Sequence, residues 1–257
     1  MTFVERVLLF SDATNLNCVS ITTRGGCDMF RVLSWIYTIM KRNVRDLTIY
    51  HQQKELLKLP LKIFHLQSLK RLSVTVLHHQ ILTWPHPQPS ASTLAALEDL
   101  TLSGFKFVNT ARDSISSSCP HLKIWKMKRC TDLYQLDVNC PNLEIFRMHE
   151  CKGLRDLVVS GPSLMTINIR DTFVHAGKGS ISTLEISAPN LRKFIWSDKP
   201  VHRYKSSKMF PSCADVRLRS FGGRDLFLSL NETRHLIIDC FSLWVCSFSS
   251  FFFTSLP

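Results

Sequence analysis

Hydrophobic residues recur along this chain in a short pattern, Pro-x-Leu-x-x-apolar-x-apolar, which is clearest between residues 119 and 196. The pattern is anchored at Pro120, Pro141, Pro162 and Pro189. The first three prolines are 21 residues apart, since 141 − 120 and 162 − 141 are both 21. A constant period of this length indicates a solenoid. Because one unit cannot bury its own apolar side, successive units are expected to stack.

Within each unit the apolar residues alternate with other residues, which is typical of short strands with one buried face. The first series of strands has apolar positions at Leu122, Trp125 and Met127; Leu143, Phe146 and Met148; Leu164, Ile167 and Ile169; Leu191, Phe194 and Trp196. A weaker second series lies midway, at Leu133, Leu136 and Val138; Leu154, Leu157 and Val159; Leu184 and Ile186. Two strands in 21 residues leave little room for a helix. The spacing therefore predicts a flattened coil with parallel sheet on two sides.

This repeat resembles the short form of the leucine-rich repeat, L-x-x-L-x-L-x-x-N/C, with Cys130 and Cys151 at the N/C position. The expected fold is an α/β solenoid, a leucine-rich-repeat coil of parallel strands that is largely β with few short helices. We expect it to form one domain over residues 1–238, because a solenoid is continuous.

The units before residue 119 are longer and are expected to carry helical or irregular turns. Asp28 can cap a helix over residues 28–41, in which Phe30, Leu33, Ile36, Tyr37 and Met40 recur at three and four residues. The following strands begin near Val44, Leu69 and Leu97, which are 25 and 28 residues apart (69 − 44 and 97 − 69). Residues 84–93 hold three prolines and are predicted to form a surface loop.

Two further segments depart from the repeat. Residues 197–210 form a basic, polar insertion, which on a solenoid can extend a binding face. Residues 239–257 form an apolar tail without the repeat. A membrane anchor is disfavoured there by Asp239, by the many serines and by the lack of a basic flank. The tail is interpreted as an exposed or poorly packed end of a truncated chain.

Composition narrows the choice of partner and compartment. The chain has 32 Lys and Arg against 20 Asp and Glu, a net charge of +12, which favours an acidic partner. Its nine cysteines are an odd number, and four of them occupy repeat-locked positions: Cys119, Cys130, Cys140 and Cys151. They are interpreted as small buried residues of a reduced, intracellular protein of the cytoplasm or nucleus rather than as a disulfide framework.

Several segments, in order, resemble the region that follows the F-box in plant F-box/leucine-rich-repeat proteins: FVERVLLF (3–10), SWIYTIMKRNVRDLTI (34–49), LKLPLKIFHLQSLKRLSV (57–74) and LEDLTLSGFKF (97–107). In that family the F-box binds the Skp1 adaptor of a cullin-RING ubiquitin ligase, while the repeats select a substrate. The resemblance spans about residues 3–238 and implies a protein-interaction module that recruits a protein substrate.

An F-box should precede Phe3, where this sequence has only Met1 and Thr2. The resemblance is therefore to the substrate-selecting arm, and binding of the Skp1 adaptor is not expected from this chain alone. A stand-alone or truncated repeat protein without ligase coupling is the alternative.

Residues that alternate with the buried ones on the first strand series point to solvent and should align on stacked coils. They give a neutral, hydroxyl-rich half before residue 119 and a basic half after it. The candidate binding residues for an acidic peptide or surface are Lys126, Lys128, Arg147, His149 and Arg170, followed by Arg217 and Arg219. The alternative is a solvated strand face whose charges only prevent sheet pairing.

Other chemistries have weaker support. The sequence His149-Glu150-Cys151 lacks the paired C-x-x-C spacing of a structural zinc site, so no metal or other cofactor is predicted. No nucleophile with a repeat-independent histidine and acid emerges, so an enzyme is not expected. Weak nucleic-acid binding through the basic face is a further alternative. It is disfavoured because Trp125 and Phe146 fall on the buried side of their strands and could not stack on bases.

Overall fold

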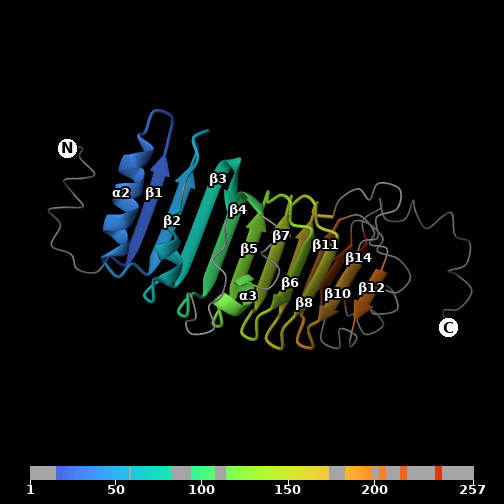
Figure 1. The fold of residues 1–257 in the computed structure, drawn as a ribbon. Coiled ribbons are helices and arrows are strands. Elements are labelled where there is room, and N and C mark those ends of the chain that lie inside the picture. Colours follow the sequence, from blue (N-terminus) through green and yellow to red (C-terminus); the bar gives the residue numbers. More distant parts are fainter. Residues whose placement is uncertain are drawn as a thin grey trace, which may run out of the picture.

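The computed structural model describes residues 16–57, 59–82, 94–107, 114–173, 183–198, 203–206, 215–218 and 235–238. These residues form an elongated coil with a parallel sheet along one side (Figure 1). The ten strands of this sheet are, in spatial order, β1 (Cys18–Thr23), β2 (Asp46–His51), β3 (Arg71–Leu82), β4 (Asp99–Phe107), β5 (Ile124–Lys128), β7 (Ile145–His149), β9 (Thr166–Arg170), β11 (Lys193–Ser197), β13 (Asp215–Leu218) and β14 (His235–Ile238).

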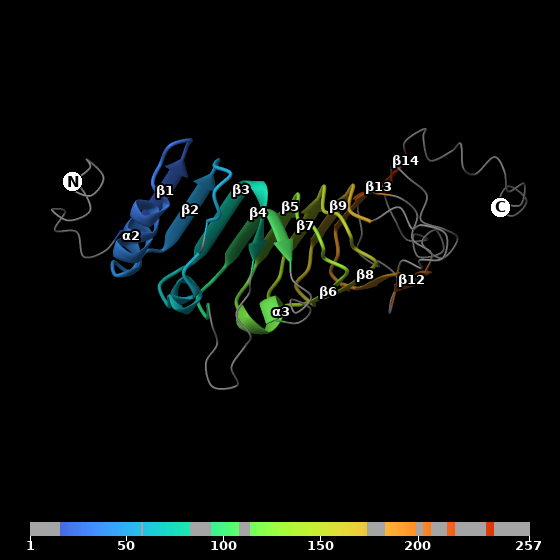
Figure 2. The same ribbon diagram turned by 45° about the horizontal axis from the view of Figure 1, so that its top comes forward.

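A second parallel sheet backs the C-terminal coils, as the second apolar series predicts. Its four strands are β6 (Gln135–Asn139), β8 (Asp156–Ser160), β10 (Thr183–Ser187) and β12 (Arg203–Ser206). Figure 2 shows β6 and β8 opposite β5, β7 and β9. The buried apolar residues of both sheets belong to one hydrophobic core. Strand β12 lies within residues 197–210, so this segment is not only an insertion between repeats but also extends the second sheet.

Equivalent apolar residues form continuous internal columns. Trp125, Phe146, Ile167 and Phe194 are in register on β5, β7, β9 and β11, and all four are fully buried. The rings of Trp125 and Phe146 meet edge to face, with centroids 5.7 Å apart. Such aromatic pairs add stabilisation beyond the area that they bury. The stacking predicted from the 21-residue period is thereby confirmed.

The N-terminal coils are backed by helices and turns instead of strands. Helix α2 (Met29–Met40) follows β1, the short 3₁₀ helix η1 (Leu61–His65) follows β2, and α3 (Ser114–Ser118) follows β4. The side chain of Asp28 accepts a hydrogen bond of 2.9 Å from the backbone N–H of Phe30, which confirms the predicted N-cap. The longer spacing of these coils leaves room for these helical turns.

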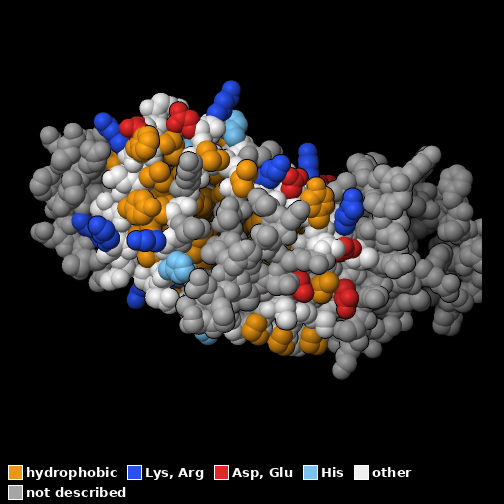
Figure 3. Space-filling view, in the orientation of Figure 1, with side chains coloured by type: hydrophobic (Ala, Val, Ile, Leu, Met, Phe, Trp, Pro, Cys, Tyr) orange, Lys and Arg blue, Asp and Glu red, His pale blue; other side chains and the backbone are white. Residues whose placement is uncertain are grey.

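The buried face of α2 differs from the predicted one. Val32, Ile36 and Ile39 face the core, whereas Phe30 is 85% exposed and Tyr37 is also exposed. The sequence of α2 is apolar on most of its circumference, so its periodicity fits more than one face. Figure 3 shows hydrophobic side chains gathered on the surface at the end of the solenoid where α2 lies.

An irregularity in the first sheet requires a glycine. The register between β3 and β4 shifts between Thr75 and Gln80, and Gly104 lies opposite this shift with φ of +81°. A Cβ atom at Gly104 would lie 1.9 Å from the carbonyl oxygen of Val76. The shift turns the Gln80 side chain inward. There its Oε1 accepts a hydrogen bond of 2.8 Å from the backbone N–H of Leu57. Only glycine fits this close backbone approach.

The four repeat-locked cysteines are buried, as predicted, and they are free thiols: Cys119, Cys130, Cys140 and Cys151. Burial raises the pKa of the Cys119 thiol far above its usual range, so this side chain behaves as a small apolar residue.

Some predictions concern residues that the structure does not describe. They are the loop at 84–93, the tail at 239–257 and the side chain of Arg219. Within the described residues, no helix is long and apolar enough to span a membrane.

Candidate binding face

The outward residues of the large sheet form two aligned rows. Row A contains the third residue of each strand and runs from Thr48 on β2 through Ser73, Thr101, Lys126, Arg147, Asn168 and Ile195 to Arg217. Row B lies two residues further along each strand and contains Tyr50, Thr75, Ser103, Lys128, His149, Arg170 and Ser197. The predicted alignment of outward residues is confirmed by this register.

Five of the candidate residues come together on three adjacent strands. We call them the basic face: Lys126 and Lys128 on β5, Arg147 and His149 on β7, and Arg170 on β9. Neighbouring strands lie about 4.8 Å apart, so each cation is within reach of the next.

The other two candidates are not part of this group. Arg217 is exposed on β13, two strands beyond β9, and Arg219 lies outside the described residues. Asn168 and Ile195, which occupy row A between Arg147 and Arg217, were expected to face solvent but are each only 7% exposed. For Asn168 one reason is visible, because the Arg170 side chain folds along β9 and its Nε donates to Asn168 Oδ1 at 3.0 Å.

The two lysines of the basic face have carboxylate partners. Lys126 Nζ lies 3.5 Å from Asp99, and Lys128 Nζ lies 4.0 Å from Glu150, which is also 3.7 Å from Arg129 Nε. These side chains are substantially exposed, and exposed ion pairs contribute only about 0–1 kcal/mol. Such pairs can exchange for a ligand at little cost.

The remaining three residues have no carboxylate partner among the described residues. The Nε of Arg147 and the Nε2 of His149 are both shielded from solvent. Neither atom makes a hydrogen bond with a described residue. Arg170 makes one side-chain hydrogen bond, to Asn168. Sequence periodicity could place these residues on one face, but it could not show which cations lack an internal partner.

Electrostatics in the basic face act most strongly on His149. Its burial lowers the pKa of the imidazole, and the positive charges of Arg170, Lys128 and Arg147 lower it further. An interaction with the Asn168 side chain opposes this shift. The protonated form of His149 is therefore disfavoured until a negative charge approaches.

Rows A and B carry no charged side chain over β1–β4. Their residues are mostly hydroxyl-bearing: Ser20, Thr22, Thr48, Tyr50, Ser73, Thr75 and Thr101. Ser103, in row B of β4, was also expected to face solvent but is only 5% exposed. The predicted division into a hydroxyl-rich half and a basic half is therefore present in one continuous sheet.

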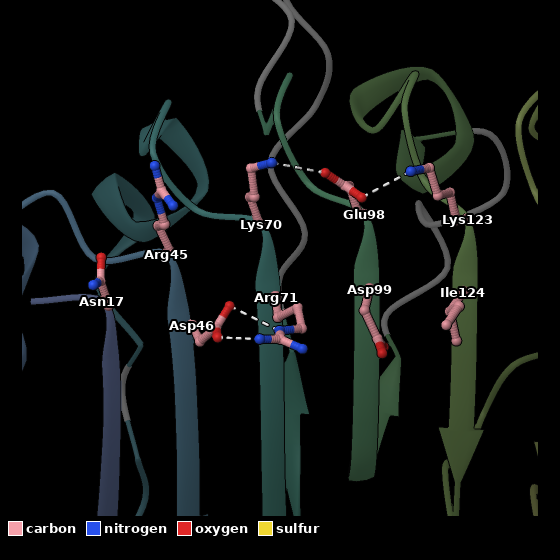
Figure 4. Close-up of a pocket in the computed structure, with 9 residues that line it drawn as sticks. All are labelled: Asn17, Arg45, Asp46, Lys70, Arg71, Glu98, Asp99, Lys123 and Ile124. Atoms are coloured by element: carbon pink, nitrogen blue, oxygen red, sulfur yellow. Dashed lines mark hydrogen bonds and ion pairs between the residues drawn. The ribbon is translucent and has the colours of Figure 1, made fainter.

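A groove that sequence reasoning missed lies where strands β1–β5 begin (Figure 4). It has a volume of about 540 Å³ and is lined by both cationic and anionic side chains. Glu98 lies between Lys70 and Lys123, at 3.1 Å and 2.9 Å from their Nζ atoms. One strand position further, Arg71 binds Asp46 through two hydrogen bonds.

The charges of this groove largely compensate one another. Hydrogen bonds from Lys123 and Lys70 lower the pKa of Glu98 to about 2. The arrangement joins successive coils and leaves little net charge for a ligand. Its signal in the sequence is a charged pair just before or at the start of three successive strands: Arg45-Asp46, Lys70-Arg71 and Glu98-Asp99.

The part of the chain that the structure describes contains no cluster of three or more His, Cys, Asp or Glu side chains arranged for a metal ion. Trp125 and Phe146 lie inside the core, as predicted, and offer no surface to a nucleobase.

A family profile described as "FBD-associated F-box protein At5g56370, LRR repeats" matches residues 32–216, which is most of the chain. The chain belongs to this family of leucine-rich repeats. A curated Arabidopsis thaliana protein named "Putative F-box protein At1g58310" is 36% identical over 76 residues, which cover 30% of this chain and 15% of that protein. No solved structure matches significantly.

This membership confirms the resemblance to plant F-box/leucine-rich-repeat proteins. Leucine-rich-repeat solenoids of this family are typically non-enzymatic modules for protein interaction. The extended surface of stacked repeats suits that role. The matched stretch corresponds to a small part of the Arabidopsis protein's length.

Proposed function

We propose that this leucine-rich-repeat chain recruits a protein substrate to an F-box ubiquitin ligase by binding an acidic segment of that substrate on the basic face. The observation that carries the proposal is the group of five cationic or titratable side chains on β5, β7 and β9, of which Arg147, His149 and Arg170 lack a carboxylate partner among the described residues. The F-box names of the family and of the Arabidopsis relative support the ligase assignment.

The geometry of the two rows suits an extended peptide. Rows A and B are two residues apart on each strand, which corresponds to about 6.6 Å at 3.3 Å per residue. An extended peptide repeats its same-side residues at about the same distance. Acidic residues at alternate positions could therefore face Arg147 and His149 together. Complementary charge would also increase the rate of encounter, and this effect decreases with ionic strength.

Binding can be tested with two variants that have equal net charge. Lys128→Gln with Arg147→Gln removes two positive charges from the basic face, whereas Thr22→Glu with Thr48→Glu adds two negative charges to the neutral half of the same sheet. The probe is an immobilised extended peptide of alternating Glu and Ser, measured by surface plasmon resonance. We expect the first variant to lose about tenfold or more in affinity, about 1.4 kcal/mol, and the second to lose much less.

Equal weakening by the two variants would show that only net charge matters and would contradict the proposed site. Unchanged binding by the basic-face variant would contradict it as well. Circular dichroism of each variant checks that the fold is retained.

The ligase assignment needs a separate test. A cellular protein captured by the wild-type chain, and not by the basic-face variant, should be ubiquitylated in a manner that depends on the wild-type chain. Capture of a partner that remains unmodified would contradict the ligase role and leave the binding role in place.

A further inference from the structure

Two cysteines occupy equivalent positions on neighbouring coils, just beyond β5 and β7: Cys130 and Cys151, which are one repeat of 21 residues apart (151 − 130). Backbone hydrogen bonds join the two coils on either side of Cys130. The N–H of Arg129 donates to the carbonyl of His149 at 2.9 Å, and the N–H of Lys152 donates to the carbonyl of Cys130 at 2.7 Å. Backbones joined in this way lie about 4.8 Å apart. Disulfides join Cα atoms that are about 4.4–6.8 Å apart, so this pair lies within bridging distance.

The side chains of the two cysteines have the same orientation. The Sγ of Cys130 lies 3.5 Å from the carbonyl oxygen of Lys128, two residues earlier in its own coil. The Sγ of Cys151 lies 3.5 Å from the carbonyl oxygen of His149, again two residues earlier. Both side chains are buried, and the two thiols are hydrogen-bonded to each other. The sulfur atoms of the two coils are therefore stacked in direct contact.

The hydrogen bond between these thiols makes them chemically unequal. It lowers the pKa of Cys130, although burial of this thiol opposes the shift. The same bond raises the pKa of Cys151, and burial raises it further. Because the thiolate is the nucleophile in cysteine chemistry, Cys130 is suited to react first. Cys151 then lies beside it as the second thiol.

A second pair of cysteines has the same spacing but different contacts. Cys119 and Cys140 are also 21 residues apart (140 − 119), and both are buried. Burial raises the pKa of both thiols, and Cys140 hydrogen-bonds with Ser116. Both thiols are therefore kept in the protonated, unreactive form. This pair is an internal control, because it shares the repeat and the burial but not the contact between sulfur atoms.

The reactive pair lies beneath a turn at the end of each strand. Arg129 and Glu150, which precede the two cysteines, are exposed and have left-handed backbone conformations, with φ of +51° and +55°. After the cysteines, an isolated bridge between Thr131 and Lys152 replaces a continuous ladder. Strand ends with few ladder hydrogen bonds open at lower free energy than strand centres. A small neutral oxidant can therefore reach the thiols by a local opening.

We propose that Cys130 and Cys151 are an oxidative modification site, at which a peroxide converts the two thiols into a reversible disulfide between the coils of β5 and β7. The Cys130 thiolate attacks one oxygen of hydrogen peroxide, the O–O bond breaks, and Cys130 becomes a sulfenic acid. The leaving hydroxide takes up the proton that Cys130 had lost and departs as water.

The sulfur of Cys151 then attacks the sulfur of Cys130. The S–S bond forms, the S–O bond breaks, and the hydroxide leaves as water with the proton of Cys151. Two thiols and one peroxide thereby give one disulfide and two water molecules. Exchange with a thiol such as reduced glutathione reverses the bond.

The experiment maps cross-links in the full wild-type chain, so no substitution disturbs the fold. The chain is equilibrated with increasing oxidised glutathione at a fixed concentration of reduced glutathione, free thiols are blocked with N-ethylmaleimide, and cross-linked peptides are identified by mass spectrometry. Trypsin combined with a protease that cuts before aspartate separates Cys130 from Cys140. We expect the Cys130–Cys151 cross-link to form at about tenfold lower oxidised glutathione than Cys119–Cys140. Hydrogen peroxide should give the same preferred cross-link.

Single variants test the order of reaction. With hydrogen peroxide, Cys151→Ser should leave Cys130 as a sulfenic acid that dimedone labels. Cys130→Ser should leave Cys151 largely unlabelled, because Cys151 has the raised pKa. Cys140→Ser is the matched control and should retain the Cys130–Cys151 cross-link. A general loss of fold would expose both cysteines to the label, so it would not produce this asymmetry.

The exposed thiol of Cys18 reports whether the oxidant has acted. Absence of the Cys130–Cys151 cross-link when Cys18 is fully modified would overturn the proposal. Equal formation of both cross-links would overturn it as well, because spacing alone would then explain the reaction. A disulfide between correctly placed sulfur atoms should raise the urea midpoint of the oxidised chain above that of the chain reduced with dithiothreitol. A lower midpoint after oxidation would contradict the bridging geometry.

Discussion

The coils before β5 and the coils from β5 onward share one sheet and one core, but they differ in what covers the back and what lines the front. The early coils are backed by α2, η1 and α3, while the later ones are backed by a second sheet. On the front, hydroxyl groups give way to cations between Thr101 and Lys126. The inward rows are mostly apolar in both regions, apart from Thr23 and His51, which pair with each other at the ends of β1 and β2.

This difference shows that inward and outward positions are under separate constraints. Inward residues must fill columns such as Trp125, Phe146 and Ile167, whichever structure backs the coil. Outward residues need only tolerate solvent, so their charge can change abruptly without disturbing the stack. A functional surface can therefore be confined to part of a uniform solenoid.

The largest effect is expected where the later coils are packed most tightly. Trp125→Ala should lower the free energy of unfolding by about 3–5 kcal/mol, because it empties a fully buried site and removes the ring contact with Phe146. Urea denaturation followed by circular dichroism measures this change. Phe30→Ala on the exposed side of α2 is the control and should change stability by less than about 0.5 kcal/mol. Similar losses of stability in Trp125→Ala and Phe30→Ala would contradict the assignment of Trp125 to the core and Phe30 to the surface.

A second effect concerns the irregular pair of strands in the early coils. Gly104→Ala should destabilise the protein by about 3 kcal/mol, because alanine is strained at a positive φ and its Cβ would collide with the Val76 carbonyl oxygen. Gly25→Ala is the matched control, since nothing lies within 4 Å of its added Cβ. Thermal unfolding of both variants gives the comparison. Equal melting temperatures would mean that the register shift can relax.

A smaller effect is expected from the charged groove that joins the early coils. Glu98→Gln removes both ion pairs of this side chain and should reduce stability modestly at pH 7. Because the folded protein lowers the pKa of Glu98 from 4.5 to about 2, the contribution is complete above pH 4.5 and is lost as pH falls toward 2.

Urea unfolding of the wild type and of Glu98→Gln at several pH values tests whether the stabilisation by Glu98 is lost as pH falls. The two midpoints should differ at pH 7 and converge near pH 2. Glu185→Gln, an exposed acid on β10 with no ion pair among the described residues, should track the wild type at every pH. If the midpoints of the wild type and Glu98→Gln moved further apart on acidification, the stabilisation could not come from the ionised Glu98 carboxylate.

Much of the solenoid could be predicted from the sequence, because each coil must bury apolar residues at the same positions and these positions repeat along the chain. Leu122, Leu143 and Leu164 recur at equal intervals, and alternation around them distinguishes inward from outward positions. The face of α2 could not be predicted in the same way, because Phe30 and Val32 are both apolar and the deciding contacts come from the rest of the coil.

The candidate site was predictable only as a row of charges. Alternation places Lys128 and Arg147 on the same face, but the partners that distinguish them follow from three-dimensional packing. Glu150 turns toward Lys128 from beyond the strand end, while Arg147 Nε is left shielded and unpaired within the described residues.

The most direct test of the basic face is to locate a bound peptide. An acidic peptide with a photoreactive group at its centre can be cross-linked to the wild-type chain, and the adducts can be mapped by mass spectrometry. We predict adducts concentrated on residues 124–128, 145–149 and 166–170, the strands β5, β7 and β9. Adducts concentrated on β1–β4, or spread evenly over the surface, would contradict binding at the basic face.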